Sequence, residues 1–323
     1  MVRKIIFGVL ITILIAIAIA FTALGCSEES DHWRAASPMP EQRGQHAIAV
    51  HDGSLYFFGG TVTEDVLAEG VFSYEYSTDT YTEGLASIPT KRSRLQASTV
   101  GDFIYVIGGW DKSRYLGTVE KYDPLKDSWT TGLEPMPTIR RDAAQVVHHG
   151  KIYVIGGREK GKQGSTANEV YDPDEDAWRS LAPMPTYRRQ ITAEVHDGVI
   201  YVFGGEDNET KDMDVVEAYH IDEDRWETGL APMPTGRHEP ASAIDSERGQ
   251  IYVTGGDVGS RDVTGAHERY DIDTDTWSTL DPLPIPRYNF HGRWLDGAAH
   301  YPGGRVPAGD GVRDYHIYDP GQD

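Results

Sequence analysis

Residues 136–157 read MPTIRRDAAQVVHHGKIYVIGG, and this stretch holds the features that decide the fold. A Pro-x-x-Arg step, Pro137 to Arg140, leads into a short apolar run. A His-Gly pair at 149–150 follows, and a second apolar run ends in the diglycine 156–157. Two apolar runs joined by a two-residue turn that contains glycine are typical of a tight β-hairpin. The stretch therefore predicts two antiparallel strands.

These features recur six times along the chain. The diglycines are residues 59–60, 108–109, 156–157, 204–205, 255–256 and 303–304. An aromatic residue recurs in step with them, at Trp33, Tyr81, Trp129, Trp178, Trp226 and Trp277. The spacing between successive diglycines is 48 to 51 residues. Such a period marks a repeat architecture, and it overrides the prior of about two domains that the chain length alone gives.

Each repeat also carries two further strand signals. Val119 to Tyr122 shows the third strand of its repeat, and the fourth strand begins at the recurring aromatic residue. Four short strands within about 48 residues are typical of one blade of a β-propeller. Residues 33–323 are therefore predicted to form an all-β, six-bladed propeller.

The recurring residues resemble the kelch repeat. The resemblance rests on a diglycine after Ile-Tyr-Val, as at 152–154, on Tyr-Asp-Pro at 171–173, on Trp178, and on the Met-Pro-x-x-Arg step that begins at Met136. It extends over residues 33–323 and implies a six-bladed kelch-type β-propeller.

The two ends of the array predict how the ring closes. The array begins at a fourth strand, residues 33–36, and ends at Tyr318-Asp319-Pro320 with no tryptophan after it. The sixth blade therefore lacks one strand, and we expect residues 33–36 to supply it. Closure removes an exposed sheet edge that would otherwise invite aggregation.

The N-terminal residues predict attachment to a membrane outside the cytoplasm. Arg3 and Lys4 precede an uncharged run, residues 5–25, which is long enough to span a bilayer. Ala23-Leu24-Gly25-Cys26 then resembles a bacterial or archaeal lipoprotein signal, with Ala23 and Leu24 in exchanged order. The resemblance implies that 1–25 is removed, that Cys26 carries the lipid, and that 26–32 is a linker. An uncleaved anchor over residues 1–25 is the alternative.

Charge and cysteine content exclude several classes of function. The chain has 30 Lys and Arg against 51 Asp and Glu, a net charge of −21, so a nucleic-acid partner is not expected. Cys26 is the only cysteine. Kelch copper oxidases need a Cys cross-linked to a Tyr, so the resemblance does not extend to that chemistry. No cofactor and no metal site is predicted, and the Asp-rich stretches such as 172–176 are interpreted as turn caps rather than calcium sites.

The arginine of the Pro-x-x-Arg step is predicted to lie at one mouth of the central channel in every blade. These residues are Arg43, Arg92, Arg140, Arg188, Arg237 and Arg287. They either bind an anionic ligand there, or pair with loop carbonyls or with a glutamate of the third strand, Glu120, Glu169, Glu217 or Glu268. In kelch proteins that bind acidic peptides, arginines that open the first strand belong to the binding surface. The resemblance carries this role to Arg92, Arg140 and Arg188 by position.

Other residues of the same loops are expected to differ between blades and to contact the ligand. Next to the repeated arginines stand Arg94, Arg141, Arg189, His238 and Tyr288, and directly after three diglycines stand Trp110, Arg158 and Arg305. Variable loops on a constant scaffold are where specificity normally lies.

Two main functions follow from these residues. The first is a membrane-tethered, non-catalytic domain that binds a protein or another anionic ligand at its arginine-lined mouth. The second is an enzyme of the sialic-acid mutarotase type acting on a carboxylated sugar, with Glu206, Asp207 and His238 as acid–base groups beside the arginines. A purely structural role at a cell surface is a third possibility.

Overall fold

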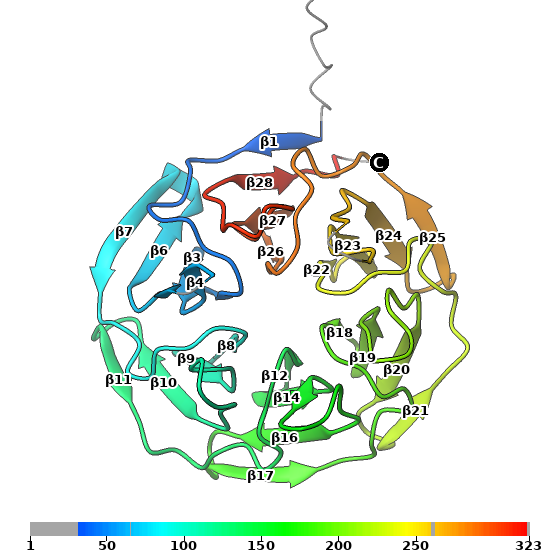
Figure 1. The fold of residues 1–323 in the computed structure, drawn as a ribbon, viewed down its shortest axis with the longest axis horizontal. Coiled ribbons are helices and arrows are strands. Elements are labelled where there is room, and N and C mark those ends of the chain that lie inside the picture. The colour runs from blue at the N-terminus through cyan, green and yellow to red at the C-terminus, as the bar shows by residue number, and fades with distance from the viewer. Residues whose placement is uncertain (1–31, 65, 260–261, 322–323) are drawn as a thin grey trace, which may run out of the picture. The chain divides into compact units, whose positions relative to one another are not determined.

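The described chain is a ring of six four-stranded antiparallel sheets (Figure 1). The structure is a computed structural model that describes residues 32–64, 66–259 and 262–321. The predicted signal or anchor 1–25, the lipidation site Cys26 and most of the linker lie outside these residues. Within the described ranges, no helix is long and apolar enough to cross a membrane.

Each blade contributes its strands in chain order, from the channel outward. Blade one has β2 (Ala47–His51), β3 (Ser54–Phe58), β6 (Val71–Glu75) and β7 (Thr80–Leu85). Blade two has β8 (Gln96–Val100), β9 (Phe103–Ile107), β10 (Val119–Asp123) and β11 (Ser128–Thr130). Blade three has β13 (Ala144–His148), β14 (Lys151–Ile155), β16 (Asn168–Asp172) and β17 (Ala177–Ser180).

The remaining blades follow the same order. Blade four has β18 (Thr192–His196), β19 (Val199–Phe203), β20 (Val216–His220) and β21 (Arg225–Glu227). Blade five has β22 (Ala241–Asp245), β23 (Gln250–Thr254), β24 (His267–Asp271) and β25 (Thr276–Thr279). Blade six has β26 (Arg293–Leu295), β27 (Ala298–Pro302), β28 (Tyr315–Tyr318) and, as its outermost strand, β1 (Trp33–Ala35).

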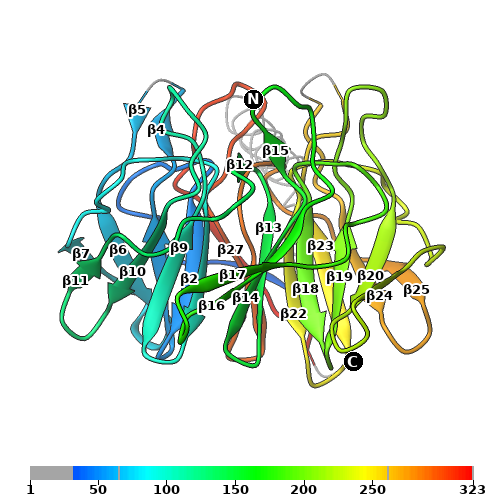
Figure 2. The same ribbon diagram turned by 90° about the horizontal axis from the view of Figure 1, so that it is seen from below.

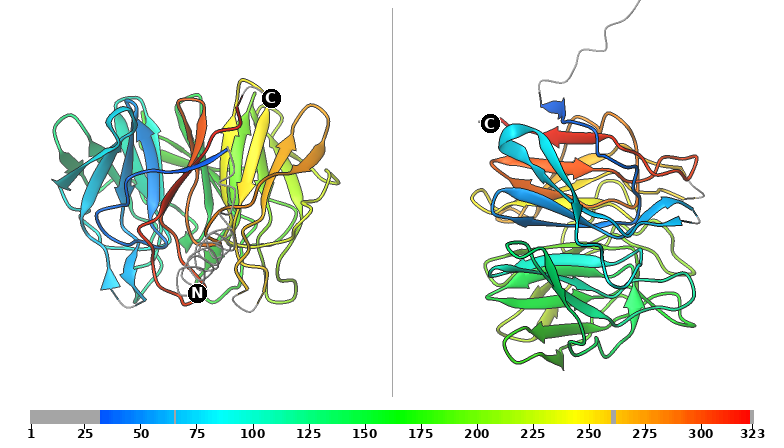
Figure 3. Two further views of the ribbon diagram at one scale, coloured as in Figure 1. Left: turned by 90° about the horizontal axis from the view of Figure 1, so that it is seen from above. Right: turned by 90° about the vertical axis from the view of Figure 1, so that its left-hand side faces the viewer.

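The ring closes as the sequence predicts. β1 pairs antiparallel with β28, with Trp33 opposite Tyr318 and Ala35 opposite His316. Figure 1 shows β1 on the outside of blade six, and the side view in Figure 3 shows it beside the last strand of the chain. The indole of Trp33 also donates to the backbone oxygen of Asp281, 3.0 Å away, which ties the closing strand to blade five.

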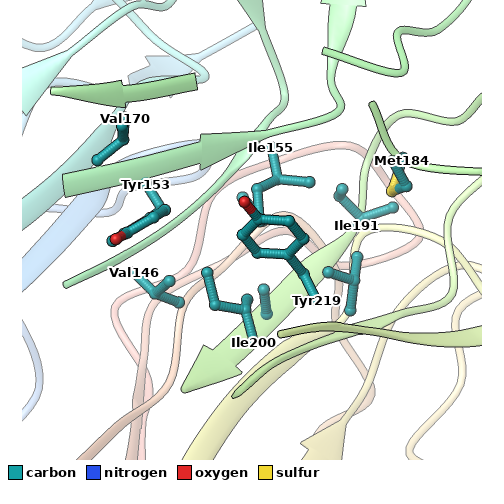
Figure 4. Close-up of a cluster of buried hydrophobic side chains, with 11 residues drawn as sticks. Val146, Tyr153, Ile155, Val170, Met184, Ile191, Ile200 and Tyr219 are labelled. Carbon is teal, nitrogen blue, oxygen red and sulfur yellow. The ribbon is translucent and has the colours of Figure 1, made fainter. Parts of the chain in front are cut away.

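Apolar side chains fill the space between neighbouring blades. Figure 4 shows one such cluster, in which Tyr153 and Ile155 of β14 meet Ile200 of β19 and Tyr219 of β20. Ile155, Ile200 and Tyr219 are all fully buried. The alternation of apolar residues along each strand therefore supplies both faces of every sheet with a partner.

Aspartates in the turns between the third and fourth strands join neighbouring blades. The Asp176 carboxylate accepts a hydrogen bond of 2.5 Å from the Tyr171 hydroxyl and one of 2.9 Å from the backbone N–H of Glu134 in the blade before. The Trp178 indole donates to the Glu134 backbone oxygen at 2.9 Å. Equivalent aspartates bond in the same way at Asp79, Asp127, Asp224 and Asp275. The Asp-rich stretches are therefore turn caps, as the sequence analysis favours.

Two sets of loops share one face of the ring. In Figure 2 the small strands β4 (Thr61–Thr63), β5 (Val66–Leu67), β12 (Arg140–Arg141) and β15 (Arg158–Glu159) lie at that face, opposite the hairpin turns. β12 pairs with β15, so the loop that leads into the first strand contacts the loop after the diglycine. We call this end of the channel the mouth.

Candidate functional site at the channel mouth

The six repeated arginines do not line the mouth, and the structure corrects this expectation. Their exposed fractions are all 1% or less. In blade three, Arg140 binds the Glu169 carboxylate at 2.5 Å and donates to the backbone oxygen of Val154 at 2.8 Å. The guanidinium thus joins the second and third strands of its own blade.

The same buried pair recurs in blades two, four and five. The partners are Arg92 with Glu120, Arg188 with Glu217, and Arg237 with Glu268, at 2.6 to 2.8 Å. Arg92, Arg140 and Arg188 therefore belong to the scaffold, and the role in ligand binding that the kelch resemblance implied for them is wrong here. The structure therefore supports the interpretation in which these arginines pair with the third-strand glutamates, and not the one in which they bind a ligand.

Blades one and six depart from this pattern. Arg43 pairs with Glu41 at 2.7 Å and lies over the ring of Phe72. Arg287 instead contacts the His316 ring nitrogen at 3.0 Å. Burial lowers the pKa of Arg287 to about 9, because no carboxylate among the described residues forms an ion pair with it.

Two positions after each repeated arginine, a polar residue faces the channel. These residues, which we call the channel ring, are Gln45, Arg94, Asp142, Gln190, Glu239 and Asn289. Each has a positive φ between 54° and 58°. The backbone N–H of each donates to the backbone oxygen of the member in the preceding blade, over 2.8 to 3.3 Å, and Gln45 bonds to Asn289. Six backbone hydrogen bonds therefore link the channel ring into a closed circle around the channel.

Arg94 belongs to the channel ring and not to the mouth with Arg141 and Arg189. Its guanidinium bonds to Asp142 at 2.7 Å and reaches Glu239, three blades away, at 3.2 Å. Burial favours the neutral form of Asp142, but the charges of Arg94, Arg141 and Arg189 together outweigh it and lower the pKa of that carboxyl. Arg94 thus spans the channel with its charge already paired, and it does not belong to the residues of the mouth, contrary to the prediction from the sequence.

The residues that do surround the mouth stand one position after each repeated arginine and directly after each diglycine. They pair across short β-bridges and form what we call the mouth ring. Its pairs are Gly44 with Thr61, Ser93 with Trp110, Arg141 with Arg158, Arg189 with Glu206, His238 with Asp257, and Tyr288 with Arg305. The structure therefore brings the predicted residues Trp110, Arg141, Arg158, Arg189, His238, Tyr288 and Arg305 together.

Blades two and three form a basic, aromatic half of the mouth. The Arg141 guanidinium lies 5.1 Å from the centre of the Trp110 ring, 4.9 Å from that of Tyr115 and 3.4 Å from the Asp142 carboxylate, which also binds Arg94. Arg158 stands opposite Arg141, and no ion pair joins it to a carboxylate of the described residues. Ile139 is 49% exposed beside Arg140, which adds an apolar surface.

Blades four and five form an acidic half. Arg189 is neutralised by Glu206 at 2.8 Å. His238 contacts Asp212 and Asp257. These residues border a cavity of about 380 Å³, whose lining is Arg189, Glu206, Asp207, Asn208, Lys211, His238 and Asp257. Glu206, Asp207 and His238, predicted as acid–base groups, therefore do meet in one pocket.

The third sector, in blades six and one, holds a buried cation. Arg305 is only 7% exposed, and its guanidinium donates to the Thr61 hydroxyl at 2.7 Å. Gly44 leaves the room for it, since a Cβ at that position would overlap the Arg305 side chain. Arg305 therefore packs against blade one more than it faces the channel mouth.

Three residues of the mouth escaped the sequence analysis. Tyr115 and Asp212 lie in the loops after the diglycines, five or more residues from the recurring positions. Asp257 directly follows a diglycine, in the same position as Trp110 and Arg158. That shared position was the available signal for Asp257, whereas Tyr115 and Asp212 had none.

Comparison with known proteins identifies the class. The chain matches the family model of the KLHDC2/KLHL20/DRC7 Kelch-repeats domain over residues 26–205 and again over 142–323. Together with six blades of this geometry, the match shows that the chain belongs to the kelch-repeat family of β-propellers.

Particular relatives are similar over parts of their sequences. Kelch-like protein 36 of Bos taurus is 27% identical over 99 residues, 30% of this chain and 16% of that protein. Kelch repeat and BTB domain-containing protein 12 of Homo sapiens is 32% identical over 116 residues, 30% of this chain and 18% of that protein. The matched stretch is thus less than a fifth of either relative.

A solved structure shares the complete fold. The structure titled "Structure of YjhT" superposes with a TM-score of 0.78 at 16% sequence identity, and covers 89% of this chain and 98% of its own. At this identity the likeness concerns the fold alone.

Proposed function

We propose that this kelch propeller binds an acidic segment of a partner protein at the basic, aromatic half of its mouth, without catalysis. The observation that carries the proposal is the pair Arg141 and Arg158. The two arginines stand opposite each other across β12 and β15, a placement that is unfavourable for like charges. A carboxylate bound between them would remove this repulsion and accept hydrogen bonds from both planar guanidinium groups.

The surroundings of this pair support a protein ligand. Arg141 packs against Trp110 and Tyr115, and its Nε has no hydrogen-bond partner. Tyr, Trp and Arg are enriched in the residues that dominate binding energy at protein interfaces. Ile139 and Tyr187, at 49% and 36% exposure, extend the surface with apolar area at its edge. The rest of the chain is strongly acidic, which keeps other anionic surfaces away from all but this half.

We further propose that the propeller is held at a membrane outside the cytoplasm. The support for this is the sequence alone: two cations, an uncharged run over residues 5–25, and Cys26 in a lipoprotein-like context. Mass spectrometry of the protein from cells that process lipoproteins tests the attachment. A diacylglyceryl group on Cys26 is expected, whereas a free thiol on a chain that still carries residues 1–25 would establish the uncleaved anchor instead.

The test of the ligand class is selection from a library of random peptides. Peptides retained by the full-length protein should be enriched in Asp and Glu, and their binding should weaken steeply as salt is raised, because an exposed ion pair is screened. Selection of basic or purely apolar peptides would contradict the proposal.

The cavity in the acidic half of the mouth supports the enzymatic alternative. Arg189, Glu206, Asp207 and His238 line one cavity of about 380 Å³, which has the volume of a small-molecule site. A cation together with carboxylates and a histidine could bind a carboxylated sugar and move protons during ring opening. Proton NMR of freshly dissolved sialic acid tests this: the alternative predicts faster equilibration of the anomers with the protein than without it, and an unchanged rate rejects it.

A further inference from the structure

A histidine in the acidic half of the mouth is held between two carboxylates. Nδ1 of His238 lies 2.9 Å from Oδ1 of Asp212, and Nε2 lies 3.9 Å from Oδ2 of Asp257. The His238 residue is 8% exposed and Asp257 is 6% exposed. Suitable donor atoms of the three side chains all lie within 4.8 Å of one another.

We infer that His238 and Asp257, oriented by Asp212, form a binding site for a divalent transition-metal ion in the cavity between blades four and five. Nε2 of His238 forms no hydrogen bond with the described residues, and the side chain, 10% exposed, lines the cavity, so this nitrogen is accessible to an ion there. An imidazole nitrogen and a carboxylate that face the same space are a pair of ligands that suits a metal ion.

The distances agree with two ligands that share one ion. Metal–nitrogen and metal–oxygen bonds of about 2.0–2.2 Å place two ligand atoms of a tetrahedral ion about 3.4 Å apart. The 3.9 Å between Nε2 of His238 and Oδ2 of Asp257 is about 0.5 Å longer, a difference that a small movement of either side chain closes when the ion binds. The other Asp257 oxygen accepts from the backbone N–H of Gly259 at 2.9 Å, which holds the carboxylate in place.

Asp212 supplies the second layer of such a site. A histidine that binds a metal through one ring nitrogen usually donates the other N–H to a carboxylate, which fixes the tautomer and the direction of the lone pair. The bond from His238 Nδ1 to Asp212 has this geometry, and it directs Nε2 toward Asp257. Gly259 leaves room for Asp212, because a Cβ on Gly259 would come within 2.9 Å of its carboxylate.

The local charge and a comparison of the six blades also support a site at His238 and Asp257. Three carboxylates, those of Glu206, Asp207 and Asp257, line the cavity against the two cations Arg189 and Lys211, and the carboxylate of Asp212 contacts His238 beside it. A divalent ion would balance this excess. Among the six pairs of the mouth ring, only the pair in blade five combines a histidine with an aspartate. One imidazole with carboxylates suits Zn²⁺, Mn²⁺ or Co²⁺, and the open positions would face the cavity.

The test is titration of the metal-free, full-length protein with Co²⁺, followed by visible absorption and by isothermal calorimetry, and then competition with Zn²⁺. We expect one saturable site per chain. H238Q and D257N should abolish it, and D212N should weaken it 10- to 100-fold, as loss of an orienting carboxylate does. The matched control is E206Q, which removes a carboxylate from the same cavity in blade four and should keep the Co²⁺ spectrum.

A second control separates this site from surface histidines. H220Q removes a ring that contacts Glu227 on the outer part of blade four, and it should leave Co²⁺ binding unchanged. Thermal unfolding of each variant establishes that it is folded. The inference is overturned if no saturable Co²⁺ binding is found, or if H238Q, folded as the wild type, binds Co²⁺ as tightly.

Discussion

Arg140 and Arg141 are neighbours in the chain, yet they belong to two different layers of the molecule. Arg140 lies inside blade three, bonded to Glu169, and its counterparts in the other five blades are equally buried. Arg141 stands at the mouth against two aromatic rings, and the equivalent position holds Gly, Ser, Arg, His or Tyr in the other blades. Both residues are arginines. What distinguishes them is that an arginine occurs at the position of Arg140 in all six blades, and at the position of Arg141 in only two.

Charged residues have two different roles in this propeller. A charged residue that recurs in every blade satisfies backbone and side-chain groups within its own sheet. A charged residue found at one or two blades is available for a ligand, provided that no carboxylate neutralises it. Arg158 meets this second condition, whereas Arg189 and Arg94 do not, and Arg141 meets it only in part, because it shares the carboxylate of Asp142 with Arg94.

The largest effect should come from the buried layer. Arg140→Ala removes the partner of Glu169 and leaves a carboxylate buried without compensation, so the free energy of unfolding should fall by about 3–5 kcal/mol. Urea denaturation followed by tryptophan fluorescence measures it. Replacing both partners, R140M with E169L, should restore most of the loss. If R140A lowers the free energy of unfolding by less than about 1 kcal/mol, the proposed difference between the buried arginines and those at the mouth is wrong.

Blade six should show a smaller cost at the same position. Arg287 faces His316 and two backbone oxygens, Asp314 and Tyr301, instead of a glutamate. Arg287→Met leaves no buried charge behind, and the expected cost of its lost hydrogen bonds is about 1–3 kcal/mol. The same denaturation experiment compares it with R140M in blade three. Equal costs for the two variants would show that the glutamates add nothing to the buried layer.

Acid should destabilise blades five and six, where the ring closes. Burial, with smaller contributions from nearby arginines, lowers the pKa of His267 and of His291 to about 3. Both are therefore neutral in the folded state, while the unfolded chain takes up protons below about pH 6.5. Stability is lost as the pH falls below that value, by about 1.4 kcal/mol per pH unit for each histidine. H291Q should reduce the slope of unfolding free energy between pH 6.5 and 5, and an unchanged slope would contradict the assignment.

The smallest effect on stability should come from the mouth. Arg158→Gln alters a partly exposed side chain without a carboxylate partner, so the free energy of unfolding should change by no more than about 0.5 kcal/mol. Thermal and urea unfolding measure it. A loss comparable to that of R140A would place Arg158 in the scaffold and remove it from the proposed ligand surface.

Most of the fold was predictable from the sequence, for a physical reason. Strand alternation, hairpin turns and diglycines are local, and they recur six times, so errors in one blade are corrected by the others. The predicted closure by residues 33–36 is confirmed by the pairing of β1 with β28. Even the irregular second strand of blade six, which ends in Pro302, pairs with the neighbouring strand at Tyr315.

The site was predicted less well because its decisive features are not local. Arg94 and Arg141 stand in similar loops, but a shift of one residue sends Arg94 into the channel ring and Arg141 to the mouth. The burial of Arg140 depends on Glu169, 29 residues away. The contact of His238 with Asp212 and Asp257 joins three separate segments, and no spacing in the sequence signals it.

The most direct test of the proposed function is the affinity of one selected acidic peptide for two matched variants, measured by fluorescence polarisation. R141Q/R158Q removes both mouth arginines, and R179Q removes an exposed arginine from β17 of the same blade. We predict that the peptide binds the double variant at least tenfold more weakly and binds R179Q as it binds the wild type. Equal affinity for all three proteins would contradict the account, because the acidic ligand would then bind elsewhere.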